Sequence, residues 1–166
     1  MFNIGDTVLY GSNGMCEITD ISTVDMPGIK KDRLFYILKQ KNGHDTIYVA
    51  TDGNTSKMRK VLSKDEAENL IKSIAQIEAL TLVNEKKPDS EFKAALQKYD
   101  CVEMLKLIKC IYLRKKQRIA EGKKVSAADE KYMRLAEDML YQEIGEALEI
   151  PREDVLNFLI KEIEGK

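Results

Sequence analysis

The chain has 166 residues, of which 43% are hydrophobic and 33% are charged, and its formal net charge is −1. This length gives one ordinary domain or two small ones with real cores, and the composition argues against a disordered or low-complexity chain. No apolar run approaches the roughly 20 residues of a membrane span, and the N-terminus lacks the features of a secretion signal, so we expect a cytoplasmic protein without membrane contact.

The first 60 residues have the composition of β-strands. Runs rich in β-branched and aromatic side chains alternate with turn signals, of which Asn42-Gly43 is the strongest because both residues accept positive φ. Strands are expected over residues 2–10, 15–21, 34–39, 46–50 and 58–62. Short strands with tight turns predict a small curled β-barrel, since closure removes exposed sheet edges.

From Ser63 onward, apolar residues recur with a period of about 3.6 residues instead of two, which predicts helices. Ser63 and Glu66 form a capping box for a first helix whose apolar face extends to Leu80. The fold class is therefore α+β, with a β-barrel domain over residues 1–62 and an all-helical bundle over 63–166. Further helix starts are expected at Pro88, Asp100, Ser126 and Pro151.

Side chains suited to catalysis or metal binding are sparse. Cys16, Cys101 and Cys110 form no Cys-x-x-Cys pair, and we interpret them as reduced, mostly buried side chains. The single histidine, His44, follows the Asn42-Gly43 turn and is expected to be a solvated loop residue. Phosphate-loop, Gly-x-Ser-x-Gly and His-Glu-x-x-His motifs are lacking. We predict a non-enzymatic protein without metal, cofactor or small-molecule substrate.

Positive charge is concentrated in one segment. Residues 104–125 carry 8 Lys or Arg and 1 Asp or Glu, whereas residues 126–166 carry 5 and 11. The segment includes Arg114-Lys115-Lys116-Gln117-Arg118 and Lys123-Lys124. One interpretation is a solvated helix surface whose cations favour the negative end of the helix dipole. The other is a ridge that contacts nucleic-acid phosphates, with Arg114 and Arg118 one helical turn apart.

Motifs in both halves carry a family resemblance. The opening Phe2-x-Ile4-Gly5-Asp6-x-Val8-x-Tyr10, with Gly14 and Thr46-Ile47-Tyr48-Val49, resembles the RNA-polymerase-interacting domain shared by CarD/CdnL regulators and the transcription-repair coupling factor. The helical C-terminal domain of CarD/CdnL proteins is similar to Phe92-Lys93 through Leu107-Ile108, the basic helix end, and Ser126-x-x-Asp129-Glu130-Lys131-x-Met133. The chain thus resembles a bacterial CarD-type transcription regulator over nearly its whole length.

This resemblance implies a Tudor/SH3-like barrel that binds the β subunit of RNA polymerase by pairing a strand edge, and a helical domain that touches promoter DNA. Main-chain hydrogen bonds would supply affinity and alternate side chains selectivity. For Tyr48 the alternative is ordinary cross-strand packing. The expected polymerase contacts are Tyr36, Thr46, Ile47 and Tyr48, and the expected DNA contacts are Lys93, Arg114, Lys115, Arg118, Lys123 and Lys124.

The chain departs from the family at one position. Members commonly carry a Trp, followed by basic residues, just before the motif matched by Phe92-Lys93, and this Trp wedges into the minor groove. The present chain has no Trp, and Ser90 and Glu91 replace the basic pair. Pro88 can serve as an apolar wedge or simply start a helix. DNA contact is therefore expected to be weak, dependent on polymerase, or transferred to the cations named above.

Three functions remain open. The first is a regulator that binds polymerase and modulates open-promoter stability. The second is an adaptor that binds polymerase without touching DNA. The third is a helix-turn-helix repressor, because the stretch from Ile144 to Val155 superficially resembles that motif. The acidic start of its second helix, Arg152-Glu153-Asp154, argues against the third function.

Overall fold

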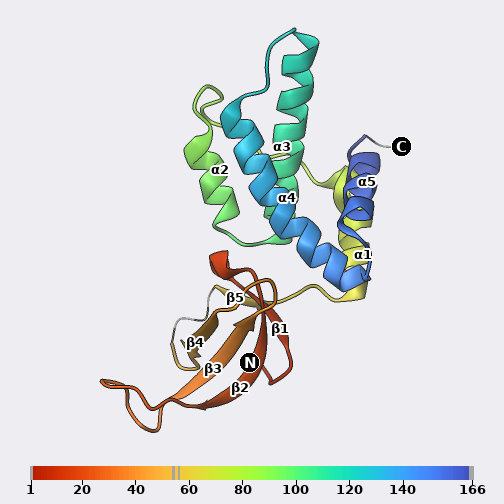
Figure 1. Ribbon diagram of the computed structural model, residues 1–166. Helices are drawn as coiled ribbons and strands as arrows, with labels where there is room; N and C mark the ends of the chain where they lie inside the picture. Colours follow the sequence, from red (N-terminus) through yellow and green to blue (C-terminus); the bar gives the residue numbers. More distant parts are fainter. Residues whose placement is uncertain (1, 54, 56, 165–166) are drawn as a thin grey trace. The chain divides into compact units, whose positions relative to one another are not determined.

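The computed structural model describes residues 2–53, 55 and 57–164. The chain divides into two compact units, Met1–Val61 and Leu62–Lys166. The first unit contains the strands and the second contains the long helices (Figure 1).

The first unit is built on one antiparallel sheet. Strand β1 (Thr7–Tyr10) pairs with β2 (Met15–Thr23) and with β5 (Met58–Lys60). Strand β3 (Leu34–Gln40) pairs with β2 and with β4 (Thr46–Ala50), which gives the order β4-β3-β2-β1-β5. All five predicted strands are present, although β1 begins at Thr7 rather than Phe2.

This sheet is open. Strands β4 and β5 form its two edges, and no strand pairing joins them among the described residues. The barrel expected from the sequence is therefore not confirmed, and the Tudor/SH3-like detail stays a prediction. Residue composition specifies strands and turns, whereas closure depends on strand tilt and stagger, which the pattern of residue types does not encode.

One face of the sheet carries the core of this unit. Val8, Cys16, Ile18 and Leu38 are fully buried there, with Tyr36, Val49 and Met58 nearly so. A register shift between Ile18 and Asp20 marks a bulge in β2, a feature that bends a strand and increases its twist. The β3–β4 hairpin is present, but its connection spans residues 41–45, and Gly43 lacks the positive φ that a two-residue turn requires.

The described residues of the second unit form five α-helices and a short 3-10 turn. Their hydrophobic core includes the fully buried side chains of Phe92, Leu105, Ile111, Ala136 and Ile144. Ser63, Asp100 and Ser126 each accept a hydrogen bond from the main chain three residues on, so the predicted caps are confirmed. The helices are α1 (Lys64–Ser73), α2 (Asp89–Leu96), α3 (Cys101–Ala120), α4 (Ala127–Leu148) and α5 (Arg152–Ile163).

The first helix is shorter than its apolar pattern suggested. It ends at Ser73 and is followed by a 3-10 turn, η2 (Ile74–Gln76). The Lys109 ammonium group, from α3, donates to the carbonyl oxygens of Ile74 and Ile77 at 2.5 Å each. These bonds satisfy main-chain carbonyl groups that the end of the helix leaves without helical partners. The apolar residues that follow, up to Leu80, pack on the core from outside α1.

The three cysteines and the single histidine have the surroundings that the sequence predicted. Cys16, Cys101 and Cys110 are buried and form no disulfide among the described residues, and burial raises the pKa of Cys16 and Cys110. His44 lies in an exposed loop. Within the described residues, no group of three or more His, Cys, Asp or Glu side chains is arranged to hold a metal ion. None of the described helices is long and apolar enough to cross a membrane.

The capping box at the start of α1 gives a test of the helical unit. In Ser63→Ala the Glu66 N–H loses its side-chain acceptor, at present 3.1 Å away, so the free energy of unfolding should fall by about 1 kcal/mol. Urea denaturation followed by helical circular dichroism measures this change. Ser73→Ala removes only a local hydroxyl bond to Leu70 at the other end of the helix and serves as the control. Equal losses in both variants would contradict the capping role.

Candidate functional site

Strand β4 is an edge strand whose only described pairing is with β3. Two main-chain hydrogen bonds flank that pairing, Thr51 N to Leu34 O at 3.0 Å and Gln40 N to Asp45 O at 3.3 Å. In an antiparallel pair, hydrogen-bonded and non-hydrogen-bonded residue pairs alternate. The positions of the β4 main-chain groups therefore follow from these two bonds by counting along the strand.

Counted from these two hydrogen bonds toward the middle of β4, Thr46 and Tyr48 occupy non-hydrogen-bonded positions. Thr46 lies opposite Lys39, and Tyr48 lies opposite Ile37. The N–H and C=O groups of Thr46 and Tyr48 consequently point away from β3, toward the open edge. Within the described chain, no other main-chain group bonds to them. Ile47 has the opposite orientation, and its main-chain groups bond to β3. Thr46 and Tyr48 thus offer an alternating row of unpaired donors and acceptors.

The side chains of β4 divide in the same way. Thr46 is exposed and Tyr48 is 45% exposed, whereas Ile47 is half-buried and packs against the core. Tyr36, expected at the polymerase-binding surface, is instead 6% exposed in the core of the sheet, with its ring 5.7 Å from that of Phe2. Its assignment to the surface was wrong, because β3 is an inner strand and Tyr36 lies on its core-facing side.

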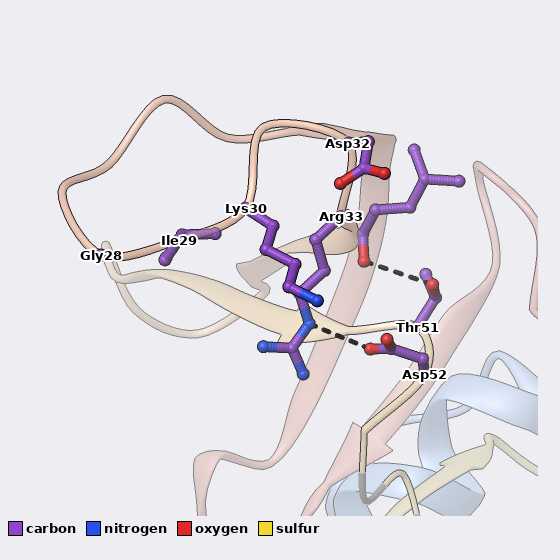
Figure 2. A pocket seen from close by; sticks show the side chains of 8 residues that line it. Gly28, Ile29, Lys30, Asp32, Arg33, Thr51 and Asp52 are labelled. Carbon is purple, nitrogen blue, oxygen red and sulfur yellow. Dashed lines mark hydrogen bonds and ion pairs between the residues drawn. The ribbon is translucent and has the colours of Figure 1, made fainter.

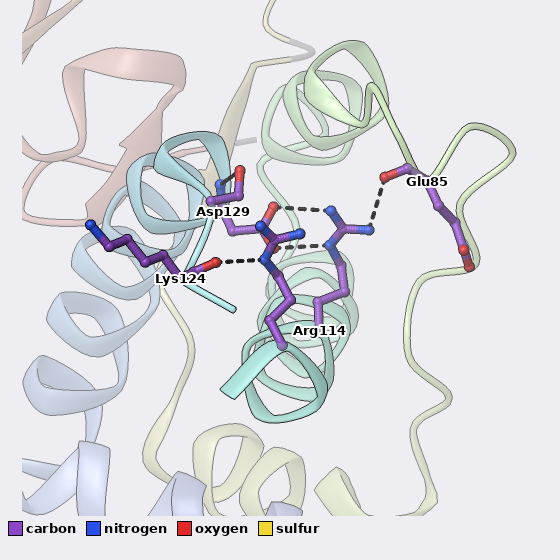
Figure 3. A network of polar contacts seen from close by, with 6 residues as sticks. Glu85, Arg114, Lys124 and Asp129 are labelled. Carbon is purple, nitrogen blue, oxygen red and sulfur yellow. Dashed lines mark hydrogen bonds and ion pairs between the residues drawn. The ribbon is translucent and has the colours of Figure 1, made fainter. Parts of the chain in front are cut away.

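In the helical unit, Arg114 is bound internally (Figure 3). Its Nε donates to Asp129 Oδ2 at 2.9 Å and its Nη2 donates to Oδ1 at 3.3 Å, while Nη1 donates to the Glu85 carbonyl oxygen at 3.2 Å. Asp129 is fully buried and the Arg114 side chain is 21% exposed. The guanidinium also lies 5.8 Å from the centre of the Phe92 ring. The expectation that Arg114 lies on a solvated face, free for phosphate, is therefore wrong.

The other predicted DNA contacts do not form one group. The Nε of Arg118 donates to the Lys124 carbonyl oxygen at 2.8 Å, and Lys123 pairs with Glu121 at 3.1 Å. Lys115 is half-buried, and its charge opposes the rise in the pKa of Glu137 that burial causes. The side chains of Lys93 and Lys124 are exposed. Several of these cations therefore already have partners within the chain.

The loop over residues 81–88, the last part of the connection from η2 to α2, is held in a defined conformation. The Glu91 carboxylate accepts hydrogen bonds from Val83 N at 2.7 Å and Asn84 N at 3.1 Å, and these bonds hold its pKa below the ordinary value. Asn84 Oδ1 accepts from the main chains of Lys86 and Lys87. Glu91, which stands where family members carry a basic residue, therefore fixes the loop that precedes α2.

This loop presents a side-chain combination that the sequence pattern did not reveal. Val83 is 95% exposed, and Lys86 and Lys87 are exposed beside it in the chain. The pairing of Arg114 with Asp129 was also missed, since the two residues lie on different helices. The available signal was an acidic residue in the first turn of α4, which the sequence explained equally well by the helix dipole.

Comparison with protein families identifies the first unit. Residues 2–62 match the family model of the CarD-like/TRCF RID domain, a domain of RNA polymerase interaction. The sequence resemblance is thus confirmed for the unit that carries β4. The match does not extend into the helical unit. No curated protein matches the chain.

The internal pairing of Arg114 predicts a large difference between two arginines one helical turn apart. Arg114→Glu places a second carboxylate against buried Asp129 and should lower the free energy of unfolding by about 3–5 kcal/mol. Arg118→Glu removes one partly exposed hydrogen bond and should cost about 1 kcal/mol or less. Urea denaturation of both variants measures the difference, and similar losses would contradict the structural role of the Arg114 pair.

Proposed function

We propose that this chain, which carries a CarD-like/TRCF RID domain at residues 2–62, is a non-enzymatic transcription regulator that binds RNA polymerase through the open edge of β4 and modulates open-promoter stability. The observation that carries the proposal is the unpaired edge at Thr46 and Tyr48 within a domain of this family. The partner subunit is the β subunit, and the complex forms in the cytoplasm.

The physical basis is strand addition. A polymerase segment that pairs with β4 would satisfy the outward N–H and C=O groups of Thr46 and Tyr48, adding a sixth strand to the sheet. The exposed side chain of Tyr48 would contact alternate residues of that segment and contribute selectivity. The ladder between β3 and β4 already fixes this edge, so little conformational entropy is lost on binding.

For the helical unit we propose a promoter contact that depends on polymerase. The loop over residues 81–88 supports this role because it presents an exposed apolar side chain, Val83, and the exposed Lys86 and Lys87 in the same short segment. Apolar side chains flanked by cations are suited to a DNA groove, where the cations neutralise phosphates and the apolar group contacts sugars or bases. Exposed Lys93 and Lys124 would add phosphate contacts.

The second candidate is an adaptor that binds polymerase alone. It is favoured by the engagement of Arg114 and Lys123 in internal ion pairs, which reduces the cations available to DNA. A helix-turn-helix repressor has less support. Helix α5 begins with Arg152, which pairs with Asp138, followed by the acidic Glu153 and Asp154. Such a helix start would repel the phosphate backbone.

Two proline variants test the strand-pairing edge. Tyr48→Pro removes an outward N–H of β4 but no bond to β3, and should weaken polymerase binding about tenfold or more. Lys60→Pro is the matched control. The main-chain hydrogen bonds from Val61 N to Thr7 O and from Gly11 N to Lys57 O flank the pairing of β5 with β1. The same alternation directs the N–H and C=O groups of Lys60 away from β1, toward the open edge of β5.

Binding of the full-length variants to polymerase, measured with circular dichroism as a check on folding, should show a loss in Tyr48→Pro alone. A folded Tyr48→Pro protein that binds at full strength would remove β4 as the polymerase-binding edge. Equal losses in both variants would show a general effect of proline on the sheet.

A charge reversal tests the promoter contact. In the double variant Lys86→Glu and Lys87→Glu, polymerase-dependent promoter binding should weaken. A plot of the logarithm of the binding constant against the logarithm of the salt concentration should also become shallower, by about one for each lost phosphate contact. Lys64→Glu with Lys72→Glu, two exposed lysines on α1, is the control of equal charge. An unchanged slope in the loop variant, with polymerase affinity intact, would favour the adaptor.

A further inference from the structure

A pocket of about 600 Å³ lies in the sheet unit, between the connection from β2 to β3 and the residues that follow β4 (Figure 2). Its lining includes Lys30, Asp32 and Arg33 from the first segment, and Thr51 and Asp52 from the second. Nothing in the strand-pairing proposal uses this pocket.

Two sets of contacts join the two sides of the pocket. The Nε of Arg33 donates to Asp52 Oδ1 at 3.0 Å, and the guanidinium lies 5.5 Å from the centre of the Phe35 ring. Both the main-chain N–H and the hydroxyl of Thr51 donate to the Leu34 carbonyl oxygen, at 3.0 Å and 3.2 Å. These bonds hold the two segments of the pocket together at Arg33–Asp52 and at Leu34–Thr51 before any ligand binds.

The charges in the pocket are unequally satisfied. Asp52 is paired with Arg33, but the two Nη groups of Arg33 make no hydrogen bond within the described chain. The Lys30 ammonium group likewise has no ion-pair partner among the described residues. In the view of Figure 2, the side chains of Lys30 and Arg33 extend in the same direction, whereas the Asp32 carboxylate points elsewhere. Among the described residues, Asp52 is therefore paired with Arg33 alone, and the Lys30 ammonium and the Arg33 Nη groups keep donors for another carboxylate.

The location of the pocket connects it to the edge of β4. Thr51 and Asp52 directly follow Ala50, the last residue of the strand. A strand advances about 3.3 Å per residue, so a segment paired along Thr46 and Tyr48 would reach the pocket within about two residues beyond Ala50. A side chain from the end of that segment would therefore approach Lys30 and Arg33 along the direction of the strand.

We propose that this pocket binds a carboxylate side chain, Asp or Glu, at the end of the polymerase segment that pairs with β4, with the Lys30 ammonium and the free Nη groups of Arg33 as donors. The proposal rests on strand pairing at β4. The main chain of the edge accepts any extended segment, whereas the pocket selects an acidic residue at one position and so fixes the register of the added strand.

Two variants of opposite charge change test this selection on the full-length protein with RNA polymerase. Lys30→Glu replaces a donor by a repelling group and should raise the Kd about three- to tenfold at low salt, with the difference shrinking at about 0.5 M salt as screening increases. Asp52→Asn releases Arg33 from its internal partner and should lower the Kd about two- to threefold. A purely structural role of the pocket would weaken binding in both variants.

Lys31→Glu is the matched control, because Lys31 is exposed in the same connection and does not line the pocket. The proposal is overturned if Lys30→Glu and Lys31→Glu change the Kd equally, or if Lys30→Glu strengthens binding while Asp52→Asn weakens it, which would indicate a cationic guest. Failure of strand pairing itself is distinguishable, since Tyr48→Pro would then leave the Kd unchanged. If Tyr48→Pro weakens binding and Lys30→Glu does not, the edge remains and the carboxylate site is rejected.

Discussion

The alternation of hydrogen bonds between β3 and β4 determines both the core of the sheet unit and the surface proposed to bind polymerase. Val49 is buried and Tyr48 is exposed because neighbouring residues of a strand face opposite sides. A shift of one residue would expose Val49 and reverse the main-chain groups at the edge. The burial that stabilises this sheet therefore also fixes the outward N–H and C=O groups of Thr46 and Tyr48.

The basic segment illustrates a different constraint, the need to pair charges near a core. Burial of Asp129 without Arg114 would leave an unpaired carboxylate, which is far more costly than an exposed one. Lys109 similarly serves the carbonyl oxygens at the end of α1. Several cations of the basic segment over residues 104–125 have internal partners, namely Lys106, Lys109, Arg114, Arg118 and Lys123.

These internal bonds also determine which groups remain for the proposed promoter contact. Arg114 and Glu91 bond to the main chain of the loop over residues 81–88, one at Glu85 and the other at Val83 and Asn84. Both charged residues therefore contribute to the proposed promoter contact through the loop that they hold. The chain has no Trp, so in the proposed promoter contact the exposed Val83 would be the apolar side chain that this loop presents.

The sequence by itself determined the elements whose causes are local. The strands and the capped helix starts at Ser63, Asp100 and Ser126 follow from residue types within a few positions, and the family of the sheet unit follows from its ordered motifs. Tertiary structure alone decided the open sheet, the burial of Tyr36, the end of α1 and the partner of Arg114. Each of these features depends on residues that are distant in the chain. The partners of a strand or a charge are the groups that lie close to it in the folded protein, and the periodicity of residue types does not identify those groups.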